Sequence, residues 1–217
     1  MNHNYLTKPI GYFDTARKSF VDILPQNKNA RLLEIGTGSG DTAAYALAES
    51  KCGWCCGVEL CEKPALEAQK KIQRVIVGDI ERITLDLPEK YFDILILSEV
   101  LEHLVDPWLV LRKLKNFMKP GSIIIAGSPN ICHRSVIWAL LCGKWYYREK
   151  GIWDATHLRW FSPESYRAMF VDCGFVVDEV GPSYPLRKKA RIFNKLTFKR
   201  FEYLLHSQIV LKGHCPE

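Results

Sequence analysis

The stretch Leu32-Leu33-Glu34-Ile35-Gly36-Thr37-Gly38-Ser39-Gly40-Asp41 decides the fold of this chain. The stretch starts with a short apolar run that contains one carboxylate, Glu34. A loop with glycine at every second position follows. The next stretch, Asp41–Ala48, has the composition of a helix that opens at its charged end. A strand, a glycine turn and a helix N-terminus let backbone approach a bound cofactor closely, because glycine has no Cβ and tolerates positive φ. The stretch therefore predicts a cofactor-binding loop.

The spacing of the glycines leaves two classes of nucleotide cofactor open. Counted from Gly36, the dinucleotide pattern G-x-G-x-x-G fails, because an aspartate holds its third glycine position. Counted from Gly38, the relaxed pattern that ends in alanine is met by Gly40 and Ala43. Glu59 also follows about twenty residues later, as the rule for a ribose-binding acid requires. A nicotinamide-dependent oxidoreductase therefore stays open as an alternative on spacing alone.

Length and composition fit one α/β domain over residues 1–217. The chain is 47% hydrophobic and 25% charged, as in ordinary globular proteins. Its start has no apolar segment of the kind that a secretory signal needs, and the apolar run Val136–Cys142 is too short to span a bilayer. We expect a cytoplasmic protein with no transmembrane segment.

The cysteines predict neither disulfides nor a metal site. Four of the eight cluster at Cys52, Cys55, Cys56 and Cys61. No second C-x-x-C pair exists to complete four zinc ligands, and two of the four fall inside an apolar run. Buried cysteines that act as small hydrophobic residues in a reducing compartment explain the pattern.

The positive charge of the chain is concentrated in one segment. Residues 187–200 contain seven lysines and arginines and no acid, so that a net charge of +6 leaves about −1 for the remainder. Interleaved apolar residues suit an amphipathic helix that covers the active-site mouth, packs on the domain or lies on an anionic surface. Nucleic acid is not expected as a partner, because it would need a wider positive field.

Alternating apolar runs and helical patterns indicate a parallel sheet with crossover helices. A turn is expected at Lys119–Ser122, and the last strand is expected to be antiparallel, at or near the sheet edge. Helices are predicted at Asp41–Ala48, Glu62–Lys71, Pro107–Met118 and from Ser162 to about Cys173. Strands are predicted at Arg31–Ile35, Trp54–Glu59, Gln73–Val77, Phe92–Leu97, Ile123–Ala126, Phe175–Val180 and Gln208–Leu211.

The order of these elements and the pattern Glu34-x-Gly36-x-Gly38-x-Gly40 resemble the class I S-adenosylmethionine (SAM) methyltransferases, from about Ile10 to the C-terminus. The resemblance implies a Rossmann-like α/β fold with a seven-stranded, mostly parallel sheet, an antiparallel seventh strand and helices on both faces. It implies that Glu34 shapes a loop that cradles the methionine part of SAM. It divides the domain into an N-terminal lid region, 1–30, and substrate-side insertions at 131–161 and 182–205.

Further residues match the cofactor motifs of this family in order. The resemblance assigns Glu59 to the ribose hydroxyls, the Asp79 carboxylate to the adenine amino group and Ile80 to the face of the adenine ring. A turn-forming aspartate is the alternative for Asp79. Tyr12 and Arg17 fall where related enzymes place an aromatic cover and a base for the methionine carboxylate, although an exposed arginine on an amphipathic helix would look the same.

Two other segments resemble the small-molecule branch of the superfamily. Tyr91–Leu104 is similar to its fourth-strand region, and quinone-biosynthesis O-methyltransferases share the Glu-x-x-Glu-His pattern there. Ser98 lies at the carboxyl end of this strand, where ligands gather in open α/β sheets. Trp153–Ser162 resembles the substrate-side segment of methyltransferases from surface-polysaccharide and secondary-metabolite pathways. The resemblance implies methyl transfer to oxygen, or less favourably nitrogen, of a small polar metabolite such as a sugar or a quinone-like acceptor.

The histidines are the candidate catalytic groups, because a hydroxyl acceptor must lose its proton to a base. His157 ranks first, since it lies in a polar, aromatic-rich stretch, and His103 ranks second, since it could simply cap a strand end. As an alternative, Glu99, Glu102 and His103 resemble the magnesium-binding phrase of small-RNA 2′-O-methyltransferases, with His157 as the fourth ligand. A protein that binds the cofactor without transferring a methyl group is a third class.

Overall fold

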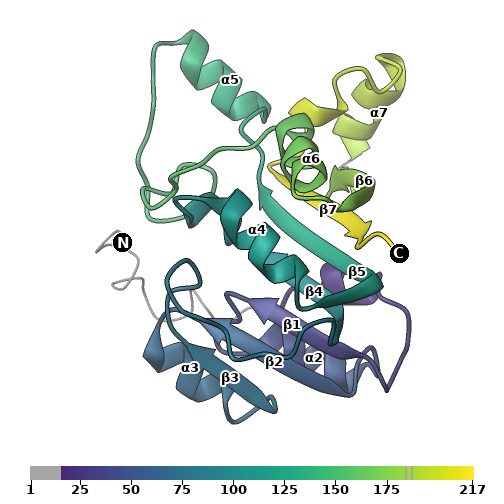
Figure 1. Cartoon of the computed structure of the whole chain (residues 1–217). Coiled ribbons are helices and arrows are strands. Elements are labelled where there is room, and N and C mark those ends of the chain that lie inside the picture. The colour runs from purple at the N-terminus through teal and green to yellow at the C-terminus, as the bar shows by residue number, and fades with distance from the viewer. Residues whose placement is uncertain (1–15, 184, 187) are drawn as a thin grey trace.

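A seven-stranded sheet with the strand order β3-β2-β1-β4-β5-β7-β6 forms the centre of the fold (Figure 1). The computed structural model describes residues 16–183, 185–186 and 188–217, and the candidate Tyr12 lies outside them. β7 runs antiparallel to β5 and β6, and the other neighbouring strands are parallel. The strands are β1 (Arg31–Ile35), β2 (Trp54–Glu59), β3 (Arg74–Val77), β4 (Phe92–Ser98), β5 (Met118–Pro129), β6 (Val176–Pro182) and β7 (Gln208–His214).

Helices connect the strands, and local capping fixes where two of them begin. The Asp106 side chain accepts from the Leu109 N–H at the start of α4, and Ser162 with Ser165 forms a capping box at the start of α6. The helices are α1 (Lys18–Asp22), α2 (Asp41–Ala48), α3 (Glu62–Ala68), η2 (Leu101–His103), α4 (Pro107–Lys115), α5 (Arg134–Leu141), α6 (Pro163–Asp172), α7 (Lys188–Leu196) and η3 (Glu202–Leu204). None of the helices described is long and apolar enough to cross a bilayer.

The observed elements follow the predicted ones closely, with two instructive differences. The turn predicted at Lys119–Ser122 is an irregularity inside β5: the pairing shifts between Phe92 and Ile94, which are opposite Met118 and Ile123. The last strand, β7, is antiparallel and near the edge, as predicted, between β5 and the edge strand β6. The second difference is α5. The sequence does not predict a helix there, because Val136–Cys142 shows only a short apolar run.

The two faces of the sheet carry two separate hydrophobic cores, because successive strand residues point to opposite faces. Leu33 and Ile35 belong to the core that includes side chains of α4 and α6, such as Leu111 and Phe170. Leu32, the residue before Leu33, belongs to the core that includes side chains of α1 and α2. The expected Rossmann-like arrangement, with helices on both faces, is confirmed.

A glycine in β5 lets α1 lie close to the sheet. A Cβ added at Gly127 would stand 2.5 Å from Cζ of Phe20, which is buried in the second core. The missing side chain therefore makes room for the aromatic ring and fixes how closely α1 approaches the sheet.

We expect Gly127→Ala to lower the free energy of unfolding by about 1–3 kcal/mol, because the added methyl group would overpack this contact. Urea unfolding of the single variant and of Gly127→Ala in a Phe20→Leu background measures the effect. The shorter leucine side chain should remove most of the cost of the alanine. Equal costs in both backgrounds would show that Phe20 is not the obstacle.

Candidate functional site

A cavity of about 540 Å³ opens at the carboxyl ends of the central parallel strands. This edge is where ligands bind in open α/β sheets, and the volume suits a nucleoside-sized ligand. Its wall is formed by the loops that follow β1, β2, β3 and β4, together with part of the segment before α6. The residues that line it include Gly36, Glu59, Leu60, Asp79, Ile80, Glu81, Arg82, Val100, His103, Leu104, Thr156 and Leu158.

The glycine loop after β1 has a backbone that only glycine adopts readily. Gly36, Gly38 and Gly40 have φ values of 70°, 54° and 78°. A Cβ at Gly36 would stand 2.5 Å from Cγ2 of Val100, so the loop also passes too close to its neighbour for a side chain. Gly40 is the N-cap of α2. The loop thus presents bare backbone toward the cavity and leads directly into a helix N-terminus, as a cofactor loop requires.

The carboxyl group of Glu34 supports this loop from inside the protein. Glu34 is 2% exposed, and the Thr37 hydroxyl donates to its Oε2 atom at 2.7 Å. Burial raises the pKa of Glu34 to about 7, against the opposing effect of hydrogen bonds from Thr37, Thr42 and the Ala43 backbone. The side chain is not in the cavity wall, and it ties the glycine loop to the first turn of α2.

Glu59, at the end of β2, joins the glycine loop to the cavity. One carboxylate oxygen accepts from the Gly38 N–H at 2.8 Å, and the other accepts from the Cys61 N–H at 2.9 Å. Burial raises the pKa of this carboxyl group, and the backbone N–H groups oppose that effect. A carboxylate offers about four acceptor positions. Glu59 can therefore hold the loop and still accept from two ligand hydroxyls.

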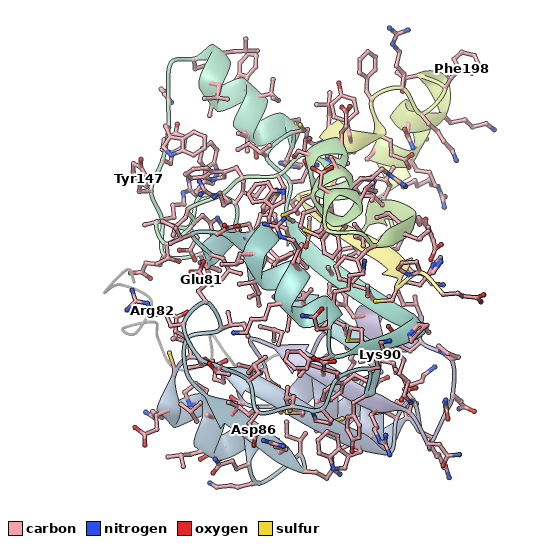
Figure 2. All side chains as sticks on the ribbon, viewed as in Figure 1. Glu81, Arg82, Asp86, Lys90, Tyr147 and Phe198 are labelled. Carbon is pink, nitrogen blue, oxygen red and sulfur yellow. The ribbon has the colours of Figure 1, made fainter. Side chains whose placement is uncertain are left out.

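Asp79 and Ile80 form the wall after β3. Asp79 accepts from the Glu81 N–H at 3.0 Å and lies 3.3 Å from Nε of Arg82. The Glu81 carboxylate in turn accepts from the backbone N–H groups of Val105 and Asp106 at 3.1 and 2.8 Å, which joins this loop to the start of α4. Figure 2 shows Glu81 and Arg82 on the loop that follows β3. Charged groups thus hold this part of the wall, and Ile80 is the apolar residue among them.

His103 reaches the cavity from η2, and its hydrogen bonds define its tautomer. Its Nδ1 atom lies 3.1 Å from the Thr156 hydroxyl oxygen and 3.3 Å from the Thr156 carbonyl oxygen. The Thr156 hydroxyl donates its own proton to Asp154 at 2.7 Å, so both of these oxygens act as acceptors for the imidazole. We infer from this network that Nδ1 carries the proton and that the basic lone pair is on Nε2.

His157 lies behind His103. It is 7% exposed and is not in the cavity wall, and the two ring centroids are 4.8 Å apart. Glu102, which is 1% exposed, completes a compact group: ligand atoms of Glu102, His103 and His157 all lie within 4.8 Å of one another. Burial, and then the charge of Glu99, raise the pKa of Glu102 well above its usual value. Three of the four residues predicted as metal ligands therefore lie close together, and the fourth, Glu99, is not part of this group.

The remaining candidate residues lie around the cavity. Ser98 pairs with Gly127 across β4 and β5 and is not in the wall. Arg17 precedes α1, and its backbone N–H donates to the Thr42 hydroxyl at 3.1 Å. Burial raises the pKa of Glu99, and the charge of Arg17 opposes this effect.

Sequence reasoning did not single out several residues of the wall. Val100 and Leu104 flank His103, and Thr156 and Leu158 come from the insertion before α6. The only signal for the last two was their position inside the segment assigned to the substrate side, because neither residue type carries a motif of its own.

We expect Glu34→Gln to change how stability depends on pH. The pKa of Glu34 is about 7 in the folded chain and 4.5 as its ordinary value, so between these pH values the folded state holds a proton that the unfolded state has released. The free energy of unfolding therefore falls in this window as pH rises, by at most about 1.4 kcal/mol per pH unit. Glutamine does not titrate, so the variant should become progressively more stable relative to the parent as pH rises through the window.

Urea unfolding on both sides of the window measures this difference. Glu67→Gln, which alters an exposed carboxylate in α3, is the matched control and should show no such trend. A constant difference between Glu34→Gln and the parent at all pH values would show that folding does not raise the pKa of Glu34.

Comparison with known proteins identifies the family. Residues 11–180 match the family model described as a methyltransferase domain. The ubiquinone biosynthesis O-methyltransferase of Pseudomonas putida (strain GB-1) is 26% identical over 196 residues, which are 85% of this chain and 82% of that protein. The 27-O-demethylrifamycin SV methyltransferase of Amycolatopsis mediterranei is 26% identical over 137 residues, 58% of this chain and 50% of that protein, so the chain spans half of that relative.

Solved structures show the same fold. A SAM dependent methyltransferase from Archaeoglobus fulgidus superposes with a TM-score of 0.68 at 22% identity, over 93% of this chain and 96% of that one. The family match also decides between the two cofactor classes that the glycine spacing left open. The chain belongs to the methyltransferase-domain family and is a class I SAM-dependent methyltransferase.

Proposed function

We propose that this enzyme transfers the methyl group of SAM to an oxygen atom, or less favourably a nitrogen atom, of a small polar metabolite such as a sugar or a quinone-like compound. The observation that carries the proposal is the histidine in the cavity wall, His103, whose ring is oriented by the Thr156 hydroxyl at Nδ1. A hydroxyl acceptor needs such a base, whereas an amine that is already neutral does not. The ubiquinone and rifamycin relatives, whose names specify O-methylation or a 27-O position, support the same direction.

The walls of the cavity fit SAM, which supplies a methyl group already activated on a sulfonium. Glu59 would accept from the ribose hydroxyls with the acceptor positions that Gly38 and Cys61 do not occupy. Asp79 would accept from the adenine amino group, and Ile80 would cover the ring. Because the donor is activated, the remaining task of the protein is to align the acceptor and exclude water.

His103 is the better placed of the two histidines for taking the acceptor proton. Its Nε2 would accept the proton of the attacking hydroxyl. The resulting imidazolium would keep its Nδ1–H donated to Thr156, whose hydroxyl is oriented by the buried Asp154. His157, expected first for this role, is buried behind the His103 ring, so we assign it to holding that ring in place.

The acceptor class is supported by an aromatic cluster beside the cavity. The segment that brings Thr156 and Leu158 to the wall also carries Trp153 and Trp160. Both rings pack edge-on against Trp145, with centroid distances of 5.0 and 5.5 Å. A partly exposed indole face can stack on a quinone-like ring or on the apolar face of a sugar.

A metal-assisted version of the reaction is the second candidate, and the close grouping of Glu102, His103 and His157 favours it. A divalent cation held there would bind the acceptor oxygen and make its proton easier to lose. An RNA 2′-hydroxyl would be an acceptor only for the metal-assisted mechanism, whereas a small metabolite is compatible with both the metal-assisted and the general-base mechanism. The two versions use the same residues and differ in which substitutions they tolerate.

We expect Glu59→Gln to weaken SAM binding by about 10–100-fold, because hydrogen bonds to a charged group contribute about 1.5–3 kcal/mol. Calorimetric titration with SAM measures the affinity, and Glu89→Gln, in the exposed loop before β4, is the matched control. Nicotinamide dinucleotides should not bind. Unchanged SAM affinity in Glu59→Gln would refute the assignment of this carboxylate to the ribose.

We expect His103→Gln to lower kcat by about 100-fold or more while leaving the Kd for SAM nearly unchanged, because the proton acceptor is lost and the cofactor contacts are not. His157→Gln and Glu102→Gln should have smaller effects, and a chelator should have none. His214→Gln, on β7 away from the cavity, is the control. Turnover is followed as label passed from SAM to small-molecule fractions of an extract.

The metal version makes a different forecast for the same experiment. All three substitutions would then abolish transfer, and a chelator would do so in the parent enzyme. Full activity of His103→Gln with a hydroxyl acceptor would sink both versions. Label found only in an RNA fraction would contradict the small-molecule acceptor.

A further inference from the structure

Two segments project from one corner of the sheet, and we call them together the cap: residues 131–161 with α5, and residues 182–205 with α7. Pro129, at the end of β5, pairs with Gln208 of β7, and Pro182, at the end of β6, pairs with Ile209. Both segments therefore leave the sheet at the same end of its strands. Figure 1 shows α5 and α7 at the same end of the molecule, beyond the carboxyl end of β5.

A buried asparagine fastens the two segments at their base. Asn130 is fully buried, and its side-chain amide donates to the carbonyl oxygens of Tyr203 and His206 at 2.6 and 2.8 Å. Asn194 of α7 in turn donates to the Glu202 carboxylate at 3.0 Å. The Asn130 bonds therefore tie the end of β5 to the end of the second segment, and the Asn194 bond joins α7 to η3.

Large apolar side chains are exposed on both projections. On α5, Trp138 and Leu141 are 70% and 75% exposed, and at the end of α7 Leu196 and Phe198 are 73% and 93% exposed. Figure 2 shows Phe198 pointing away from the fold beyond α7. Large apolar side chains that are exposed together mark an interaction surface.

The sequence of the cap segments is also strongly basic. The cap segments contain twelve lysines and arginines and three acids, a net charge of +9, so the remainder of the chain carries −3. Lys195, Lys199 and Arg200 are exposed and alternate with the apolar residues Leu196 and Phe198. An anionic partner with an apolar interior complements both features at once.

We propose that the cap docks on an anionic lipid bilayer. Cations of an amphipathic helix are attracted to anionic headgroups, while aromatic and leucine side chains enter the boundary between headgroups and acyl chains. A second copy of this chain fits less well, because it would bring two strongly positive surfaces together. Nucleic acid would satisfy the charges and leave Trp138, Leu141 and Phe198 in water.

Docking in this way would bring the acceptor side of the cavity close to the lipid. The cavity lies at the carboxyl edge of the sheet, where the cap also begins, and Thr156 and Leu158 in its wall belong to the cap segment 131–161. This inference does not depend on which atom is methylated. It concerns where the enzyme is held, and lipid binding can be measured with no acceptor present.

Flotation of the full chain with vesicles tests the proposal. We expect binding to vesicles of equal parts phosphatidylcholine and phosphatidylglycerol, little binding to phosphatidylcholine alone, and weaker binding as salt is raised. Lys195→Glu with Lys199→Glu should reduce binding at least about 25-fold, since each lost cation near the surface costs about fivefold. Trp138→Ala with Leu141→Ala should reduce it at least about tenfold, because it removes the inserting side chains.

Lys28→Glu with Lys90→Glu is the matched control. It makes the same charge change at exposed positions near the amino ends of β1 and β4 and should leave binding nearly intact. SAM affinity should be unchanged in every variant, which shows that each remains folded. Equal binding to neutral and anionic vesicles, or insensitivity to both cap variants, would overturn the proposal. So would self-association that Trp138→Ala abolishes, or preferential binding of single-stranded RNA in competition with the vesicles.

Discussion

The hydrogen bonds to one buried carboxyl group hold the part of the structure on which the site depends. Glu34 lies under the glycine loop, where the Thr37 hydroxyl contacts it directly and the start of α2 contributes further donors. Removing a carboxyl group from water is costly, and these donors offset much of that cost. The loop itself has three glycines at positive φ and is attached to β2 through the N–H groups of Gly36 and Thr37, which donate to the Val58 carbonyl oxygen. The buried Glu34 contact on one side and the Glu59 carboxylate on the other thus hold the loop between them.

The site combines two kinds of support that respond differently to substitution. The cofactor side is built from backbone conformation and from carboxylates at strand ends, which hydrogen bonds within the protein already hold in place. The acceptor side depends on a relay of polar side chains, Asp154 to Thr156 to His103, that joins an insertion to the end of β4. General-base and metal-assisted chemistry make similar demands on this relay, because both need a ring nitrogen held in one orientation.

Much of the fold could be predicted from the sequence, because short local patterns of residues determine where most elements begin and end. β1, β2 and α2 have the predicted bounds, since apolar runs and glycine turns define them within a few residues. The irregular start of β5 could not be predicted, because Gly121, with φ 72°, and its neighbours look like a turn. The strand continues across them because Met118 and Ile123, on either side, both pair with β4. Likewise, the ordering of His103 and His157 depends on a contact between residues far apart in sequence. The pattern of apolar and polar residues in the sequence does not indicate which of the two imidazole rings faces the cavity.

The strand order also has a consequence for how the chain is made. β6 has no partner in the sheet until β7, the next strand along the chain, inserts between it and β5. While the ribosome is still adding the intervening residues, β6 has an unpaired backbone and β5 presents an open edge, a state that favours association with other nascent chains. During that interval the short, charged stretch Val176–Pro182, with Asp178 and Glu179 among its residues, is protected mainly by its own acidic side chains.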